Sequence, residues 1–106
     1  MNLKEKYTEL LINIGFPEKE IQRNWLELES AYSKKSRYYH NLTHIGDMID
    51  CYETYLEKLL FPNEILYAIF YHDYIYNSRK KDNELKSAEY ALSILPENIS
   101  FDRQLV

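Results

Sequence analysis

The chain has 106 residues, of which 45% are hydrophobic and 28% are charged, and this balance predicts a single folded domain over residues 1–106. Its formal net charge of −4 argues against binding to nucleic-acid backbone, which requires a basic surface. No stretch approaches the roughly 20 apolar residues of a membrane span, no signal peptide is recognisable, and the single Cys51 excludes an intrachain disulfide. We therefore expect a cytoplasmic protein that binds neither nucleic acid nor a membrane.

Apolar residues recur at helical spacing through the first third of the chain. A stripe from Leu3 to Ile14 predicts one helix, and Gly15 is a typical C-cap for it. Pro17 suits the first turn of a second helix, because its missing N–H would be unpaired there in any case. The apolar stripe of this second helix consists of Ile21, Trp25, Leu28 and Tyr32.

A third helix is predicted after the polar stretch of residues 33–37, with Asn41 as its N-cap. Its core-facing seam follows helical spacing and consists of Leu42, Ile45, Ile49, Tyr52, Leu56 and Leu59. Pro62 marks the break before a fourth helix, which we expect over about residues 63–74. This helix is apolar on most sides, and such a helix is usually central and buried.

A fifth helix is predicted between the charged stretch of residues 78–82 and Pro96. Its core-facing stripe would consist of Leu85, Ala88, Leu92 and Leu95. No segment has the length and alternation of a strand. The expected fold class is therefore all-α, a bundle of about five helices with short connections.

The residues with the most informative context are His72 and Asp73, at the end of the apolar fourth helix. An ionised carboxylate that is buried without a partner costs several kcal/mol or more, so a metal, a basic side chain or a helix N-terminus should compensate Asp73. The chain's histidines all fall in two short segments, at positions 40, 44 and 72. Imidazole and carboxylate groups together are a common ligand set for divalent metals. A buried histidine is more often a hydrogen-bonded core residue than a ligand, so both interpretations stay open on composition and spacing.

Three ordered segments resemble the HD-domain superfamily, and most closely its group of predicted metal-dependent phosphohydrolases. They run from Arg37 to Ile45, from Ala68 to Asp73 and from Asp82 to Ala88. The first is also similar to the Tyr-His-Asn-x-x-His-Ala motif of cyclic-nucleotide phosphodiesterases, which share the HD core. The resemblance extends over about residues 25–91 and implies an HD-domain-like helical bundle.

The resemblance implies a set of metal ligands in this chain. His44 matches the first histidine ligand, and His72 and Asp73 match the pair that gives the superfamily its name, with Asp73 able to bridge two metals. The cofactor would be a divalent ion such as Mn, Mg, Fe, Zn, Ni or Co. The substrate would be a small phosphorylated molecule, for instance a nucleotide, whose phosphate ester is hydrolysed by metal-activated water.

The resemblance also assigns catalytic roles outside the ligand set. His40 matches the histidine that serves as the general acid in the phosphodiesterases. Arg37 is a candidate phosphate clamp, because a guanidinium can grip two phosphate oxygens. Glu84 would contact a metal through water or orient the substrate. An equally good interpretation makes Glu84 an N-terminal helix carboxylate beside an Asn83 cap.

One part of the superfamily's pattern has no clear counterpart, namely a fourth protein ligand provided by an Asp on a later helix. Asp82 belongs to the third matching segment and Asp102 lies near the end of the chain, so neither matches by position. The chain therefore resembles the N-terminal portion of an HD domain, and we expect a C-terminally incomplete bundle. Apolar surface left open in such a bundle tends to be buried against another copy, which predicts a homodimer or higher oligomer.

Two alternative functions follow from the same residues. The chain could be a catalytically inactive or truncated HD-like helical domain that acts as a binding or oligomerisation module. An HD-type di-iron oxygenase would share the ligands but normally needs additional histidines, and the sequence contains only three.

Overall fold

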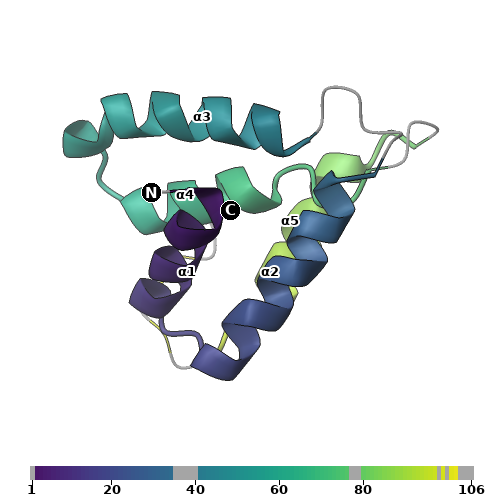
Figure 1. Ribbon diagram of the computed structural model, residues 1–106, viewed down its shortest axis with the longest axis horizontal. Coiled ribbons are helices and arrows are strands. Elements are labelled where there is room, and N and C mark those ends of the chain that lie inside the picture. The colour runs from purple at the N-terminus through teal and green to yellow at the C-terminus, as the bar shows by residue number, and fades with distance from the viewer. Residues whose placement is uncertain (1, 35–40, 77–79, 98, 100, 103–106) are drawn as a thin grey trace.

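The computed structural model describes residues 2–34, 41–76, 80–97, 99 and 101–102. Within these ranges the chain forms five α-helices and one short 3-10 helix, with no strand, which confirms the predicted all-α class (Figure 1). The helices are α1 (Leu3–Ile14), α2 (Glu18–Tyr32), α3 (Leu42–Thr54), η1 (Leu56–Lys58), α4 (Pro62–Tyr71) and α5 (Asn83–Ser93). A membrane-spanning helix would need a longer apolar stretch than any of the described helices provides.

Local capping signals set the ends of α1. The Asn2 side chain accepts a hydrogen bond from the Glu5 N–H at 2.8 Å, and the Glu5 carboxylate accepts one from the Asn2 N–H at 3.3 Å, which forms a capping box. At the other end Gly15 has a φ of 117°, in the left-handed region, and its N–H bonds to the Leu11 carbonyl. This confirms Gly15 as the C-cap. Pro17 lies at the N-cap of α2, directly before the helix rather than inside its first turn.

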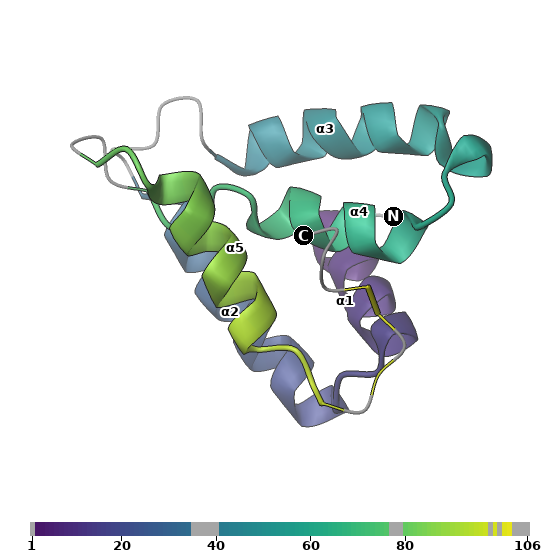
Figure 2. The ribbon, with the colours of Figure 1, turned by 180° about the vertical axis from the view of Figure 1, so that it is seen from behind.

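Helix α4 is the centre of the bundle, as its apolar sequence predicts. It packs against α1, α3 and α5, and in Figure 1 it lies between α3 above and α1 below. The reverse view in Figure 2 shows α5 running alongside α2. A hydrogen bond of 3.3 Å from the Tyr90 hydroxyl to the Glu27 carboxylate also joins these two helices. The buried side chains of α4 are Tyr67, Ile69, Phe70 and Tyr71.

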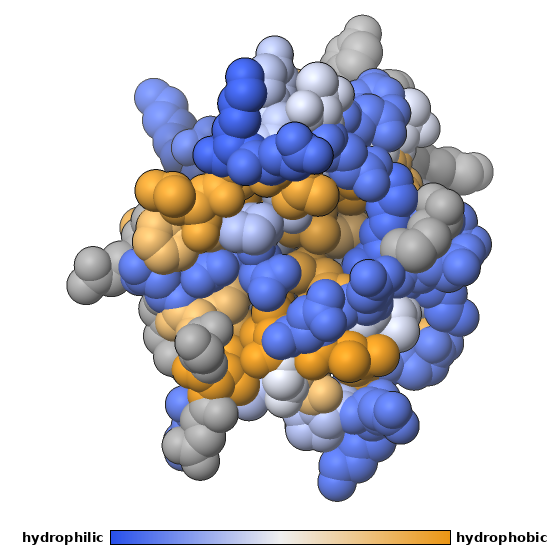
Figure 3. All heavy atoms as spheres, turned by 90° about the vertical axis from the view of Figure 1, so that its left-hand side faces the viewer, coloured by the Kyte–Doolittle hydropathy of each residue, from blue (hydrophilic) through white to orange (hydrophobic). Residues whose placement is uncertain are grey.

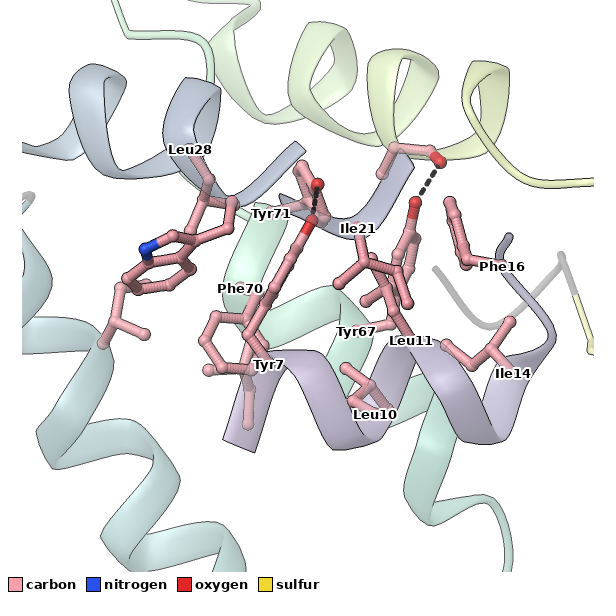
Figure 4. Close-up of a cluster of buried hydrophobic side chains, with 14 of the residues drawn as sticks. Tyr7, Leu10, Leu11, Ile14, Phe16, Ile21, Leu28, Tyr67, Phe70 and Tyr71 are labelled. Atoms are coloured by element: carbon pink, nitrogen blue, oxygen red, sulfur yellow. Dashed lines mark hydrogen bonds between the residues drawn. The ribbon is translucent and has the colours of Figure 1, made fainter. Parts of the chain in front are cut away.

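Buried tyrosines give this core polar cross-links between helices. The Tyr7 and Tyr71 hydroxyls are 2.5 Å apart, and the Tyr67 hydroxyl donates to the Ala91 carbonyl at 2.7 Å (Figure 4). Burial raises the pKa of all three phenols, because the charged phenolate is poorly solvated in the core. In the pair of Tyr7 and Tyr71 either hydroxyl can be the donor. Each bond fixes a position along α4 relative to α1 or α5.

The predicted core face of α5 is wrong in part. Leu85 is 60% exposed, whereas Ser87 and Ala91 are completely buried. Small side chains allow the α5 backbone to approach α4 closely enough for the Tyr67 hydroxyl to reach the Ala91 carbonyl. Side-chain size therefore decides which face of α5 is buried, and hydrophobic periodicity alone misses it.

The predicted length of the fourth helix is also wrong, because α4 ends at Tyr71 and not near Tyr74. In a continuing helix the Asp73 N–H would bond to the Ile69 carbonyl. Instead the Ile69 carbonyl lies 2.7 Å from Nδ1 of His72, and the Asp73 N–H donates to the Tyr32 hydroxyl at 3.1 Å. These competing partners end the helix and place His72 and Asp73 in the turn that follows.

The two glycines allow a direct test of the cap. Gly15→Ala should lower the free energy of unfolding by about 1–2 kcal/mol, because L-residues pay that cost in the left-handed region. The added methyl would also lie 3.0 Å from the Ile99 side chain. Gly46→Ala is the matched control, since its methyl meets nothing within 4 Å and Gly46 lies inside α3. This control should raise the free energy of unfolding by about 0.5–1 kcal/mol in urea titrations. Equal effects of the two changes would contradict the assigned cap.

Candidate metal centre

Three predicted metal ligands come together in the structure. His44 lies in the first turn of α3, and His72 and Asp73 follow α4 directly. One ligand atom from each lies within 4.8 Å of the other two. The centroids of the two imidazole rings are 5.6 Å apart, and Nε2 of His72 is 3.2 Å from Oδ2 of Asp73. Residues 28 positions apart in sequence thus present nitrogen and oxygen donors to one point.

The position of His44 follows from the cap of α3. The Asn41 side chain accepts a hydrogen bond from the His44 N–H at 3.1 Å, which confirms Asn41 as the N-cap and fixes the first turn. One residue later, Ile45 is completely buried and helps to seat α3 on the core. Because α3 packs against α4, His44 faces the end of α4 where His72 and Asp73 lie.

The position of Asp73 depends on Tyr32, the last residue of α2. The Tyr32 hydroxyl accepts the Asp73 N–H at 3.1 Å and donates to the Phe70 carbonyl at 2.8 Å. This side chain is only 1% exposed, so the two hydrogen bonds are shielded from water. Sequence reasoning assigned Tyr32 only to an apolar stripe. The Tyr32 hydroxyl could have indicated a further role, because a buried tyrosine usually finds a hydrogen-bond partner.

The tautomer of His72 is set by its backbone contact. Its Nδ1 lies 2.7 Å from the Ile69 carbonyl oxygen, which can only accept, so Nδ1 carries the proton. In the neutral ring, Nε2 then has the free lone pair, and such an Nδ1–H to carbonyl bond is a frequent support for metal-binding histidines. The structure therefore directs Nε2 of His72, the nitrogen that could bind a metal, toward Asp73.

The distances are compatible with shared coordination of a cation. Ligands at about 2.1 Å from an ion, at angles between a right angle and tetrahedral, lie roughly 3.0–3.4 Å from each other. The 3.2 Å between His72 and Asp73 falls in that range. It would equally suit an ion pair with doubly protonated His72, so the metal interpretation depends on the third donor, His44. Even opposite ligands of one ion lie only about 4.2 Å apart, so donors as far apart as 4.8 Å would have to move closer together to share an ion.

The donor group is partly open to solvent. The side chains of His72 and Asp73 are 30% and 13% exposed. Asp73 is thus largely but not fully buried, which is less extreme than its apolar sequence context predicts. Such exposure leaves room for water or a substrate beside the three donors.

Glu84 lies near this group but does not belong to the set of metal donors. It is in the first turn of α5 and lines a pocket of about 230 Å³ together with His72. The other lining residues are Ala68, Tyr71, Ser87, Ala88 and Ala91. The N-cap of α5 is Asp82 and not Asn83, and the Asp82 side chain makes no capping hydrogen bond. Glu84 is therefore placed to face a molecule in the pocket.

Ser87 is a second residue that sequence reasoning missed. Its hydroxyl accepts the Ile75 N–H at 3.0 Å and donates to the Ile75 carbonyl at 3.1 Å. Both bonds tie the segment after Asp73 to α5. Tyr32 and Ser87 thus hold the segment that carries the His-Asp pair from both sides.

The remaining predicted site residues lie either outside the described residues or, where described, outside the donor group. Arg37 and His40 lie outside the described residues. Asp82 is at the N-cap of α5, and the Asp102 N–H donates to the Glu64 carboxylate at 3.1 Å. Within residues 2–34, 41–76, 80–97, 99 and 101–102, the group of His44, His72 and Asp73 gains no fourth protein ligand.

No family model matches the chain, and comparison with curated proteins and with solved structures likewise gives no match. The resemblance to the HD-domain superfamily therefore stays an expectation that rests on the three sequence segments. The structure adds the all-α fold and the grouping of the three donors.

Removing the Tyr32 hydroxyl should lower both the stability of the fold and the affinity of the candidate site for a metal. Tyr32→Phe leaves the part-buried Asp73 N–H and the buried Phe70 carbonyl without this partner, at a cost of about 1–3 kcal/mol in the free energy of unfolding. Loss of a group that supports a ligand typically lowers metal affinity by about 10–100-fold. Denaturant titration and Co²⁺ or Zn²⁺ titration measure the two effects.

Tyr52→Phe is the matched control for this change. The Tyr52 hydroxyl donates to the Pro62 carbonyl at 3.2 Å, away from the three donors. The control should lose some stability and keep its metal affinity. Unchanged metal affinity in Tyr32→Phe would show that this hydroxyl does not position Asp73.

Proposed function

We propose that this chain is a metal-dependent phosphohydrolase of the HD type, which hydrolyses a phosphate ester. The observation that carries the proposal is the grouping of His44, His72 and Asp73, whose donor atoms lie within 4.8 Å of one another. The HD resemblance supports it independently, because the motifs pointed to these residues through sequence alone. The proposed localisation is cytoplasmic, and the proposed partner is a small phosphorylated substrate.

The donor set fits a divalent cation by its chemistry. Two imidazoles and one carboxylate suit Zn, Fe, Mn, Co and Ni, and suit Mg less well. When bound, such an ion lowers the pKa of a water molecule and offsets negative charge on phosphoryl oxygens. Three protein ligands leave coordination positions for water and substrate, as catalytic sites require. Each donor has support from the chain: Asn41 for His44, the Ile69 carbonyl for His72 and Tyr32 for Asp73.

The proposal keeps the two catalytic roles that the resemblance assigns outside the described residues. His40 would give a proton to the leaving oxygen, a step typically worth about 10²–10⁴-fold. Arg37 would hold the phosphate through paired hydrogen bonds. Both residues lie close in sequence to Asn41, which begins α3 and the first turn that carries His44.

Metal binding should depend on each of the three donors. His44→Ala, His72→Ala and Asp73→Asn should each retain less metal than the wild type after dialysis against Mn²⁺, Ni²⁺ or Zn²⁺, as measured by elemental analysis. Asp102→Asn is the matched control, because this carboxylate is outside the donor group. Since metal bound to the native state stabilises it by mass action, added metal should also raise the Tm of the wild type and of the control.

Phosphatase activity in Mn²⁺, Mg²⁺ or Ni²⁺ should follow the same ranking of variants. His72→Ala should lose the metal-dependent turnover of the wild type, and Asp102→Asn should keep it. The metal site is rejected if the wild type binds no more metal than His72→Ala. If metal binds and no phosphate ester is hydrolysed, the hydrolase assignment fails while the metal site stands.

A second candidate function is an HD-like binding or oligomerisation module. It is favoured by exposed apolar side chains where α3 leads through η1 into α4, and Figure 3 shows hydrophobic side chains on the face that carries this corner. The exposed residues there are Tyr55, Leu56, Leu60 and Phe61, and Leu60 is 87% exposed. Exposed apolar patches of this kind often mark protein–protein contacts.

This surface predicts self-association that depends on Leu60. Sedimentation velocity should show a dimer or higher oligomer in the wild type as concentration rises, and Leu60→Lys should shift the distribution toward monomer. Leu26→Lys is the matched control, because Leu26 is 53% exposed on α2, away from this corner. A wild type that stays monomeric at high concentration would remove this function from consideration.

A further inference from the structure

The pocket between α4 and α5 opens beside one of the three metal donors. His72 belongs to both: its Nε2 faces Asp73, and its side chain lines the pocket of about 230 Å³. The pocket is also lined by Ala68 of α4 and by Ala88 and Ala91 of α5. A molecule with its phosphate at the donor group would therefore have an apolar chamber directly adjacent.

The walls of this pocket are fixed by hydrogen bonds. The Ser87 hydroxyl bonds to both backbone groups of Ile75, and the Tyr71 hydroxyl bonds to Tyr7 on α1. On the far side the Tyr67 hydroxyl holds the Ala91 carbonyl. Ser87 and Ala91 are completely buried, and their side chains are too small to rotate into the pocket and fill it. The pocket is therefore formed before any ligand binds, which is usual for small-molecule sites.

The volume limits what fits. An engineered cavity of about 150 Å³ accommodates benzene, and pockets for drug-sized ligands span about 300–1,000 Å³. At about 230 Å³ this pocket lies between the two. A single ring or a short branched chain would fill it, and a complete nucleoside would extend beyond it into solvent.

The rim adds a charge preference. Glu84 is exposed in the first turn of α5 and lines the same pocket. An ionised carboxylate only accepts hydrogen bonds, so it favours a hydroxyl or ammonium group on the ligand and disfavours a second phosphate. The pocket thus combines an apolar chamber for a small group with an acidic edge.

We propose that the alanine-lined pocket binds the organic part of a phosphate monoester, a single ring or a short branched chain smaller than a nucleoside, while the phosphate lies at His44, His72 and Asp73. This inference rests on the proposed function for the position of the phosphate. The occupancy of the pocket by the organic group can be observed separately from hydrolysis.

The test uses phenyl phosphate as the probe and follows alanine methyl groups by NMR in the full chain. With metal present, phenyl phosphate should shift the methyl signals of Ala68, Ala88 and Ala91 in a saturable manner. Inorganic phosphate should leave these three signals in place. Adenosine monophosphate should bind at least about tenfold more weakly than phenyl phosphate, because pocket size discriminates by that order.

A pocket-filling variant supplies the second measurement. Ala88→Leu should weaken phenyl phosphate binding by about tenfold or more and leave inorganic phosphate and metal binding unchanged. Glu89→Leu is the matched control, since the same side chain is introduced one residue away at a position that does not line the pocket. Glu84→Gln should reduce the preference for phenyl phosphate over phenyl diphosphate.

The outcomes separate the two proposals. Unmoved alanine methyl signals in the wild type would overturn the pocket inference, and so would equal probe affinity in Ala88→Leu and Glu89→Leu. Equal binding of adenosine monophosphate through the same methyl groups would overturn the size class. Shifted methyl signals without any metal binding or hydrolysis would support the pocket while the phosphohydrolase assignment fails.

Discussion

The hydroxyl of Tyr32 is the contact on which the candidate site depends. It lies where the helical hydrogen-bond ladder of α4 is interrupted, between the Asp73 N–H and the Phe70 carbonyl. Without a partner outside α4 at this point, the helix would continue through Asp73, and the Asp73 side chain would point in a different direction. With it, the chain leaves the helix after Tyr71, and His72 and Asp73 point their donors toward α3. One side chain of α2 thus sets the geometry of a group made by α3 and α4.

Buried hydroxyl groups also form hydrogen bonds between elements in the rest of the core, in addition to the apolar contacts. Tyr7, Tyr67 and Tyr71 are buried and hydrogen-bonded, and Ser87 does the same work beside Ile75. A buried hydroxyl without a partner is costly, so each of these bonds restricts how the two elements that it joins can shift relative to each other. The result is a helical bundle whose elements are held at defined offsets near the donor group and the neighbouring pocket.

Local features of the fold could be predicted from sequence because their causes are local. Gly15 and Asn41 act within one turn of their own helices, and both predicted caps are confirmed. The stripe of α2 is also confirmed in full: Ile21, Trp25, Leu28 and Tyr32 are buried. The gathering of His44 with His72 and Asp73 was predicted through a motif resemblance and not through spacing, since nothing in the periodicity specifies how α3 meets the end of α4.

The predictions that were wrong depend on contacts between residues far apart in the sequence. The end of α4 depends on Tyr32, 41 positions from Asp73, and no local pattern reports such a contact. The buried face of α5 depends on how closely two backbones approach, so small Ser87 and Ala91 are buried while Leu85 is exposed. Hydrophobicity ranks Leu85 above both, and packing reverses that order. The roles of Arg37 and His40 rest on the sequence motif, because these residues lie outside the described ranges.

Helix α3 is attached to the rest of the bundle by few elements. It packs mainly against α4, and an ion pair of 2.7 Å between Lys6 and Glu53 holds its C-terminal half to α1. His44 lies at the other end, opposite His72 and Asp73. On the proposed function, an ion shared by these donors would add a link between the N-terminal end of α3 and the end of α4, so docking of this end of the helix and binding of the ion would be coupled. Ion affinity would then report how firmly the first turn of α3 is docked, and a change that loosens this end of the helix would lower the affinity for the metal.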